Sequence, residues 1–304
     1  MSEVAETEAA GFHSSGATVS GASVRAAAPL AFAGLALDRP CIMGVVNVTP
    51  DSFSDGGDAY PPSAAIDRGL ALHAAGAAIV DVGGESTQPG AERVPVDEEL
   101  ARIVPVIQEL TRSGAVVSVD TRRAAVMEAA IDAGAAIIND VSALTGDPGS
   151  MQVVARSQAS VVLMHMQGDP RTMQVTPRYN DVVREVCGWL CERIAACEAA
   201  GIAPNRLAVD PGIGFGKTVD HNLALLAHLD VFADLGRPLV LGVSRKSFIA
   251  RLSRDEPPKN RVAGSLAAGL FGLLHGVHIL RVHDVADTRQ ALAVWQAMTD
   301  KRFN

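Results

Sequence analysis

Cys41-Ile-Met-Gly-Val-Val-Asn-Val-Thr-Pro-Asp-Ser-Phe-Ser-Asp-Gly-Gly57 joins an apolar segment directly to a polar loop. It opens with an apolar run at 42–48, long enough for one buried strand and too short for a helix. Pro50 stops any continuation, and a polar loop rich in Asp, Ser and Gly follows. A buried strand that ends in polar side chains, here Asn47 and Thr49, is typical of a parallel α/β active site. An ordinary strand followed by a turn is the alternative, so the other strands must decide between the two.

Composition narrows the class of protein. The chain has 304 residues, of which 48% are hydrophobic and only 4% aromatic, so its core must be built from small aliphatic side chains, as in parallel sheets. The formal net charge of −8 argues against a nucleic-acid or anionic-membrane partner. No apolar run is long enough to span a membrane, and the first residues lack the charge and apolar run of a signal peptide.

The four cysteines do not have the spacing of a zinc or redox motif. Cys187 and Cys191 would share a helix face, so a metal site is conceivable there. Small buried or half-buried thiols are the simpler interpretation. They fit a reducing, cytoplasmic setting.

One pattern repeats from the first strand to the end of the chain. Eight apolar runs predict strands at 41–48, 77–82, 115–120, 136–141, 160–166, 207–210, 238–243 and 277–282. Helical periodicity between and after them predicts helices at 63–75, 97–110, 124–133, 179–200, 219–235, 259–275 and 285–298. A doubly wound open sheet is the alternative, but eight strands with a helix after the last favour an α/β fold of the (β/α)₈ TIM-barrel type.

The barrel is expected to form a single domain over residues 29–304, since barrels of this length run as one unit. A short strand or hairpin is expected between residues 29 and 40. Residues 1–28 are rich in Ala, Ser, Gly and Glu without sustained period, and we expect a disordered tail.

Polar residues follow the expected strands at the edge where barrel enzymes carry their chemistry. Asp120, Asn139 and Asp210 would offer hydrogen-bonding groups in an apolar pocket, which suits a planar heterocycle rich in N–H groups. Lys246 would add a cation for a ring nitrogen or carbonyl. Each has a structural alternative when taken alone: a helix cap for Asp120, a strand-end contact for Asn139, a turn for Asp210 and a solvated pair with Arg245 for Lys246.

Arg281, His283 and Asn47 come from the last and first strands, which become neighbours when a barrel closes. A guanidinium with an imidazole and an amide is typical of an anion site, and barrels often bind phosphate in this region. Asn47 could also hold Mg²⁺, which takes few protein ligands when phosphate supplies others. His283 could instead be a packed strand-end histidine.

The glycine-rich stretch 212–218 is not a nucleotide-binding loop. The first glycine of a Walker A pattern would fall on Pro211, and Lys217 occupies the last glycine position of the dinucleotide motif. We expect the glycines to let the backbone pass close to a ligand, with Phe215 packing against it.

From about residue 30 onward the chain resembles dihydropteroate synthase, a family of pterin-binding barrels. The matching segments are Asn47-Val-Thr-Pro-Asp-Ser-Phe-Ser-Asp-Gly-Gly57, Gly83-Gly-Glu-Ser-Thr87, Ser118-Val-Asp-Thr121, Ile138-Asn-Asp140, Met164-His-Met-Gln167, Asp210-Pro-Gly-Ile-Gly-Phe-Gly-Lys217, Gly242-Val-Ser-Arg-Lys-Ser247 and Arg281-Val-His-Asp284. The resemblance implies condensation of 6-hydroxymethyl-7,8-dihydropterin diphosphate with 4-aminobenzoate, which gives dihydropteroate and releases pyrophosphate. It also implies a homodimer.

The resemblance assigns roles to individual residues. The pterin would be held by Asp120, Asn139, Asp210, Lys246, Phe215 and Gly242. The diphosphate would be held by Asn47, Thr87, Arg281 and His283, with Mg²⁺ at Asn47. The aminobenzoate side, where sulfonamides compete, would be shaped by Phe53, Thr87, Pro89, Phe215, Lys246 and Ser247. The catalytic residues would be Asp120, Lys246, Arg281 and His283, of which Asp120 would stabilise positive charge on the pterin methylene and the last two the leaving group.

One position departs from the family pattern. The second loop of the family usually carries an arginine where this chain has Gln88, and that arginine is thought to pair with a first-loop aspartate, matched here by Asp55. Gln88 can still donate a hydrogen bond to Asp55 but loses the charge-assisted pair. We therefore expect weaker loop closure and slower turnover with pterin binding retained. Steady-state kinetics of Gln88→Arg test this, since unchanged kcat and KM values would refute it.

Two rival interpretations share the fold. A methyltetrahydrofolate-dependent methyltransferase that works with a corrinoid protein is the first, but Met164-His-Met-Gln167 and the Arg281/His283 pair favour the synthase. A catalytically weak paralogue that binds pterin without turnover is the second. Pyrophosphate release by the purified protein separates them.

Overall fold

The computed structural model describes residues 30–49, 62–86, 93–169 and 172–300. The tail expected at 1–28 lies outside these ranges.

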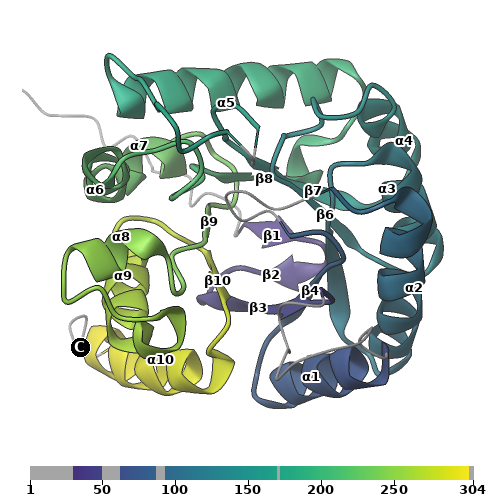
Figure 1. The fold of residues 1–304 in the computed structure, drawn as a ribbon, viewed down its shortest axis with the longest axis horizontal. Helices are drawn as coiled ribbons and strands as arrows, with labels where there is room; N and C mark the ends of the chain where they lie inside the picture. The colour runs from purple at the N-terminus through teal and green to yellow at the C-terminus, as the bar shows by residue number, and fades with distance from the viewer. Residues whose placement is uncertain (1–29, 50–61, 87–92, 170–171, 301–304) are drawn as a thin grey trace, which may run out of the picture.

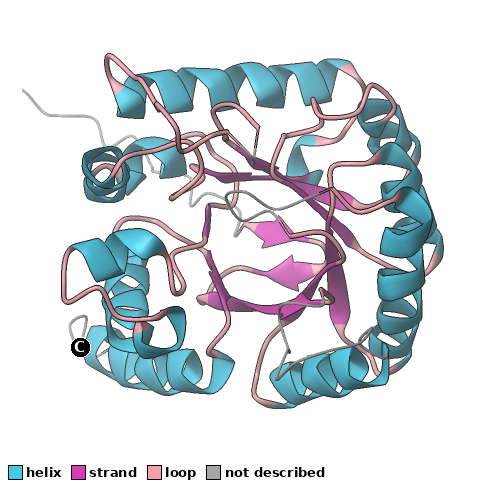
Figure 2. Ribbon diagram, in the orientation of Figure 1, coloured by secondary structure: helices cyan, strands magenta, loops and turns pink. Residues whose placement is uncertain are grey.

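Eight parallel strands form the barrel at the centre of the molecule (Figures 1 and 2). They are β3 (Cys41–Asn47), β4 (Ile79–Gly83), β5 (Val116–Asp120), β6 (Ile137–Asp140), β7 (Ser160–Met164), β8 (Leu207–Asp210), β9 (Val240–Leu241) and β10 (Ile279–Val282). The order of hydrogen-bonded neighbours is β8-β7-β6-β5-β4-β3-β10-β9. A parallel bridge between Val209 and Leu239 links the two ends of this order. The predicted (β/α)₈ barrel is therefore confirmed.

Helices form a ring outside the strands (Figure 2). They are α1 (Pro62–Ala74), α2 (Val96–Arg112), α3 (Ala124–Asp132), α4 (Ser150–Arg156), α5 (Val182–Ala199), α6 (Val219–Ala227), α7 (Leu229–Ala233), α8 (Ser247–Arg251), α9 (Val262–Leu274) and α10 (Val285–Asp300). The predicted helix at 219–235 is interrupted, because His228 leaves helical geometry at φ −128° and ψ 38°. The sequence did not predict α4 and α8, which are too short to show a helical period.

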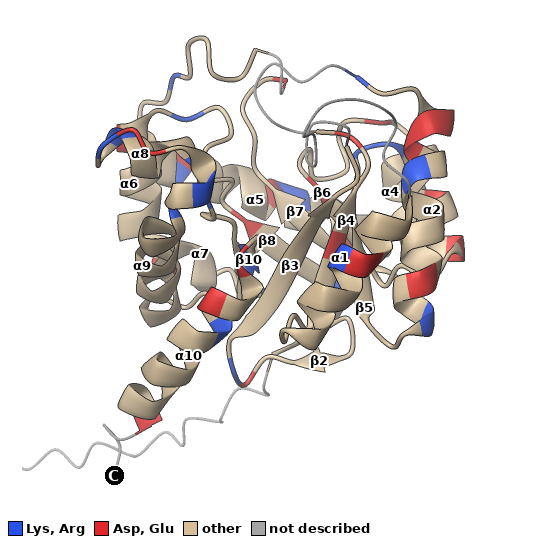
Figure 3. Cartoon of the chain, turned by 60° about the horizontal axis from the view of Figure 1, so that its bottom comes forward, with Lys and Arg blue, Asp and Glu red and all other residues tan. Residues whose placement is uncertain are grey.

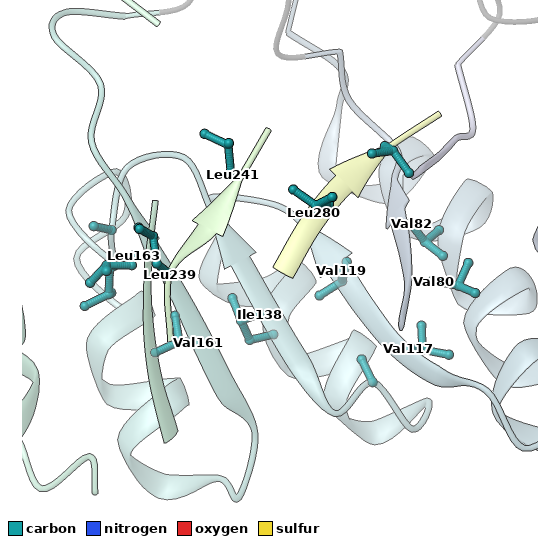
Figure 4. Packing of buried hydrophobic residues seen from close by; sticks show 14 of the residues in the cluster. Val80, Val82, Val117, Val119, Ile138, Val161, Leu163, Leu239, Leu241 and Leu280 are labelled. Carbon is teal, nitrogen blue, oxygen red and sulfur yellow. The ribbon is translucent and has the colours of Figure 1, made fainter. Parts of the chain in front are cut away.

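The strands bury side chains on both faces, and the two faces form separate layers of core. In β4, Val80 and Val82 point outward and pack in the layer that faces the helices, whereas Ile79 packs inside the barrel. Figure 4 shows side chains of the outer layer on several strands. Alternation along a strand places every second residue on the same face. The polar residues in phase with Ile79 are therefore directed into the barrel.

A short hairpin closes the N-terminal end of the barrel. β1 (Ala31–Phe32) and β2 (Leu35–Ala36) pair antiparallel, which confirms the expected hairpin. Phe32 is buried and packs with Met43 and Ile279 at the bottom of the barrel interior. The opposite end, where the strands finish, is left for function.

Among the described residues, none of the helices combines the length and apolar character that a membrane crossing would require. All four cysteines are free; Cys41 and Cys197 are buried and Cys187 is half-buried. Cys191 is exposed, contrary to the expectation of buried or half-buried thiols.

Candidate active site

The C-terminal ends of neighbouring strands bring polar side chains together inside the barrel. Asp120 is paired in register with Asn139 on the next strand, and Asp210 is paired with Met164. Figure 3 shows acidic and basic positions on the strands as well as on the outer helices. A charged residue directed into a barrel needs partners, because burial disfavours an isolated charge.

These residues surround one cavity. The lining includes every residue that was predicted to hold a pterin, and it adds Arg281 and several apolar neighbours. It is formed by Asp120, Asn139, Val141, Met164, Asp210, Gly212, Ile213, Phe215, Gly242, Lys246 and Arg281.

Asp120 and Arg281 form an ion pair in the cavity wall. The guanidinium Nη2 of Arg281 donates to Asp120 Oδ2 at 2.7 Å. Burial raises the pKa of Asp120 to about 7, against the opposing charge of Arg281 and with a further push from nearby Asp81. Burial alone would lower the pKa of Arg281, but Asp81 and Asp120 outweigh it and raise that pKa. The site therefore holds a permanently charged guanidinium beside a carboxyl that titrates near neutral pH.

Lys246 approaches the cavity from the other side. Its Nζ donates to the carbonyl of Ile213 at 2.6 Å and lies 4.0 Å from the centroid of the Phe215 ring. Burial lowers the pKa of Lys246 to about 7, although Asp210 opposes the shift. Burial also raises the pKa of Asp210, partly offset by the hydrogen bond that Gly212 N–H donates to its Oδ1 at 2.7 Å.

Arg245 and Lys246 do not form a solvated surface pair, because the turn before Lys246 separates their side chains. Arg245 adopts φ +59°, a left-handed conformation that is strained for a residue with a side chain. The reversal sends neighbouring side chains in different directions. Arg245 forms two hydrogen bonds with Asp284, one of them from Nε to Oδ2 at 2.9 Å, while Lys246 lines the cavity.

In the glycine-rich loop after β8, neighbouring backbone atoms leave no room for a side chain at two of the glycines. A Cβ atom at Gly212 would lie 1.9 Å from the carbonyl oxygen of His165, and one at Gly216 would lie 2.5 Å from that of Gln167. Glycine is required at these two positions because protein backbone occupies the space of a side chain, and Gly212 also lines the cavity; the expected close approach to a ligand stays a prediction. Gly214 lies against the side chain of Lys246.

Lys217 stabilises the same loop through hydrogen bonds. Its Nζ donates to the carbonyl of Phe215 at 3.0 Å and lies 3.0 Å from His165 Nδ1. Burial lowers the pKa of Lys217 to about 7. Burial also lowers the pKa of His165 to about 3, with Lys217 acting in the same direction. The pair fixes the backbone that carries Phe215.

The residues predicted to hold a diphosphate come from adjacent strands, because β10 pairs with β3 in register. Arg281 is part of the cavity wall, whereas His283 and Asn47 lie outside its lining. His283 Nδ1 lies 3.0 Å from Ser244 Oγ, and burial lowers the pKa of His283 to about 4, helped by Arg281. The imidazole is therefore neutral near pH 7. The contact with Ser244 Oγ gives one ring nitrogen a hydrogen-bond partner.

The Mg²⁺ expected at Asn47 would have few protein ligands. In the described ranges no group of three or more His, Cys, Asp or Glu side chains could hold a metal ion. Asn47 ends β3 beside Gly83 and near Asp120. One amide oxygen of this kind fits an ion whose other ligands are phosphate and water.

The predicted residue Ser247 does not line the cavity. Ser247 begins α8 and is exposed. Phe53, Asp55, Thr87, Gln88 and Pro89 lie outside the described residues.

Asp81, which lies inside the barrel, was not among the predicted site residues. Its Oδ2 accepts hydrogen bonds from Arg281 and Asn139. The signal was available: Asp81 is in phase with Ile79 and Gly83, so the alternation that buries Ile79 also directs the carboxylate inward. Met164 and Ile213 also line the cavity and carry no polar signal that would have marked them.

Comparison with known proteins gives one consistent result. Residues 43–283 match the family model described as pterin binding enzyme. The dihydropteroate synthase of Neisseria meningitidis serogroup B is 49% identical over 271 residues, which is 87% of this chain and 94% of that protein.

Solved structures agree. That of Xanthomonas albilineans dihydropteroate synthase with 4-aminobenzoic acid superposes with a TM-score of 0.83 at 52% identity and covers 88% of this chain and 96% of the other. The enzyme of the same organism in complex with 7,8-dihydropteroate gives a TM-score of 0.79 at 50% identity, covering 87% and 95%. Coverage is nearly complete on both sides, and the matched region contains the whole cavity. The chain therefore belongs to the dihydropteroate synthase family of pterin-binding enzymes.

Proposed function

We propose that the protein condenses 6-hydroxymethyl-7,8-dihydropterin diphosphate with 4-aminobenzoate, giving 7,8-dihydropteroate and pyrophosphate in folate biosynthesis. The observation that carries this proposal is the single cavity in which Asp120, Asn139, Asp210, Lys246 and Arg281 meet. The related structures that hold 4-aminobenzoic acid and 7,8-dihydropteroate support this pair of substrates.

The cavity suits a pterin ring. Such a ring presents an amino group and ring N–H groups along its edge, which need acceptors such as the carboxyl oxygens of Asp120 and Asp210. Lys246 supplies a donor for a ring nitrogen or the carbonyl, and Phe215 gives an apolar wall. Buried acceptors discriminate strongly against rings that lack the matching donors.

The reaction needs no protein nucleophile. The bond between the pterin methylene and the diphosphate oxygen breaks with its electron pair on pyrophosphate, and the amine of 4-aminobenzoate then attacks the methylene and loses a proton. Asp120, when ionised, stabilises positive charge on the pterin, and Arg281 and His283 hold the leaving diphosphate. Asn47 would hold Mg²⁺, which would neutralise charge on the leaving group.

The second substrate would enter beside the pterin. Phe215 and Lys246 line this part of the cavity, and Ser247 lies next to Lys246 in the chain. We infer that Phe53, Thr87 and Pro89 complete the aminobenzoate site, with Thr87 also reaching the diphosphate. Sulfonamides would compete here because they share the aniline ring of aminobenzoate.

Release of pyrophosphate by the purified protein tests the proposal. The complete reaction is compared with three omissions: 4-aminobenzoate, the pterin diphosphate and Mg²⁺. We expect release that depends on both substrates and falls when Mg²⁺ is chelated. Absence of release in every arm would reject the synthase and leave a pterin-binding paralogue.

The proposed assembly is a homodimer in the cytoplasm. α9 and α10 lie side by side (Figure 1) and carry the exposed apolar side chains Phe271, Leu274, Val294 and Met298, with Leu274 60% exposed. Exposed apolar side chains on two neighbouring helices support an interface at this face. The four free cysteines favour a reducing compartment.

Light scattering after size-exclusion chromatography tests the dimer. We expect the mass of two chains for the wild type and of one chain for Leu274→Lys. A monomeric wild type at micromolar concentration would contradict the proposal.

A further inference from the structure

Asp81 accepts hydrogen bonds from two residues that line the cavity but does not line it itself. It lies in the middle of β4 with 0% of its surface exposed. Its Oδ2 accepts from Arg281 Nε at 2.7 Å and from Asn139 Nδ2 at 3.0 Å. Arg281 belongs to β10 and Asn139 to β6, which lie two strands away from β4 on opposite sides. One carboxylate oxygen thus accepts hydrogen bonds from side chains on strands at both sides of β4.

The contact with Asn139 sets the orientation of its amide. Asn139 Nδ2 donates to Asp81 Oδ2, so the NH₂ group of Asn139 faces Asp81. The carbonyl oxygen of the same amide is then turned away from Asp81, toward the cavity that Asn139 lines. Asn139 therefore presents an acceptor to a ligand, like its neighbours Asp120 and Asp210.

The contact with Arg281 fixes which edge of the guanidinium is free. Nε and Nη2 both lie 2.7 Å from Asp81 Oδ2, and Nη2 also reaches Asp120. Nη1 has no hydrogen bond to any residue in the described ranges. The planar guanidinium presents its donors in a rigid fork, so fixing one edge directs the remaining donors.

We propose that Asp81 is a positioning residue that makes the pocket selective for donor-rich rings and holds the Arg281 guanidinium in place for the diphosphate. This inference rests on the proposed function, because it assigns Asp81 a part in binding the same pterin substrate. Asp81 does not touch the substrate; it acts through Asn139 and Arg281.

Ser118 provides a matched control. It is the register partner of Asp81 on β5, it is also 0% exposed, and its hydroxyl has no partner among the described residues. Ser118→Ala therefore changes the same buried layer without touching Asn139 or Arg281. It should leave the kinetic constants unchanged.

Asp81→Leu keeps the size of the side chain but removes both carboxylate oxygens. Asn139 Nδ2 and Arg281 Nε then lose the acceptor that they share, so the Asn139 amide can reverse and present its donors to the donors of the pterin. We expect kcat/KM for the pterin diphosphate to fall about 10-fold to 100-fold, the cost of one unsatisfied buried polar group. The KM for 4-aminobenzoate should change by less than about twofold, because that substrate does not use Asn139.

A double variant separates positioning from general stability. In Asp81→Leu with Asn139→Asp, the new carboxylate carries no donor that needs a partner at position 81 and offers an acceptor to the ligand in either orientation. Isothermal titration with 6-hydroxymethylpterin, which lacks the diphosphate, should show weakened binding for Asp81→Leu and recovery in the double variant. Thermal unfolding of each variant confirms that it is folded.

The results test the positioning role, the orientation of the Asn139 amide and the proposed function separately. Wild-type constants for Asp81→Leu, or an equal rise of KM for both substrates, would overturn the positioning role. Failure of the double variant to recover affinity would overturn the argument about the Asn139 amide. A wild type that releases no pyrophosphate would reject the proposed function instead, and the titrations would still judge Asp81.

Discussion

Asp120 is held between opposing influences. Burial favours its neutral form, while the guanidinium of Arg281 favours the ionised one, and the resulting pKa is about 7. A ligand that brings positive charge or N–H donors would shift this balance toward the carboxylate. Asp120 can therefore respond to charge that develops on the pterin, as a preformed electrostatic partner.

Asp120→Asn tests this role at the level of the residue. The amide keeps the size of the side chain but cannot ionise, so we expect kcat to fall about 10²-fold to 10³-fold. Steady-state pyrophosphate release measures the effect. A change smaller than about threefold would mean that Asp120 is not used electrostatically.

His165 predicts a pH dependence of stability. The folded protein keeps this histidine neutral down to a pKa of about 3, whereas the unfolded chain protonates it near the ordinary 6.5. Between these values only the unfolded state binds the proton, so stability falls as the pH drops from 6.5 toward 3. Within this window each drop of one pH unit removes on the order of 1.4 kcal/mol of unfolding free energy.

His165→Asn isolates this contribution, because the amide oxygen can replace Nδ1 as the acceptor for Lys217. Urea unfolding at pH 7 and pH 5 should show a smaller loss of unfolding free energy for the variant than for the wild type. Equal losses would mean that another group carries the acid sensitivity.

The loop after β8 shows how elements position the site. Gly212 has φ +69°, and a Cβ there would lie 1.9 Å from the carbonyl oxygen of His165. Gly236 has a similar φ of +65°, yet nothing lies within 4 Å of its added Cβ. The two glycines therefore share a backbone cost and differ only in the space around them.

Gly212→Ala and Gly236→Ala form a matched pair. We expect Gly236→Ala to lower the unfolding free energy by about 1 kcal/mol, the cost of a left-handed alanine. Gly212→Ala should cost about 2 kcal/mol more, because backbone must move to admit the methyl group. Chemical denaturation measures both. Equal costs would show that the loop relaxes freely around Gly212.

The sequence predicts the helices and strands better than the contacts between them. The eight strands follow from short apolar runs, and the inward side chains at their ends follow from alternation and from the rule that barrels place chemistry at that edge. The break at His228 could not be foreseen, because 219–235 keeps a helical pattern across it. The partners of Asp81 depend on which strands face each other across the interior, which periodicity within one strand does not encode.

The whole molecule separates stability from function along the barrel axis. The hairpin at the N-terminal end contributes Phe32, which is buried against Met43 and Ile279. The cavity lies at the other end, where Asp120, Asp210 and Arg281 meet. Changes at the bottom of the barrel should therefore affect folding without affecting binding.

Phe32→Ala tests this separation. Loss of a buried aromatic ring should lower the unfolding free energy by about 3–5 kcal/mol. The KM for both substrates should stay unchanged at a temperature where the variant is folded. A raised KM for the pterin diphosphate would show that the two ends of the barrel are coupled.

The proposed function requires the cavity of Asp120, Asn139, Asp210, Lys246 and Arg281 to make dihydropteroate. The decisive experiment is mass spectrometry of the reaction of the purified protein with both substrates, with pyrophosphate measured in the same samples. The prediction is one molecule of 7,8-dihydropteroate for each pyrophosphate released, with both products greatly reduced in Asp120→Asn. Pyrophosphate without dihydropteroate, or neither product from the folded wild type, would contradict the account.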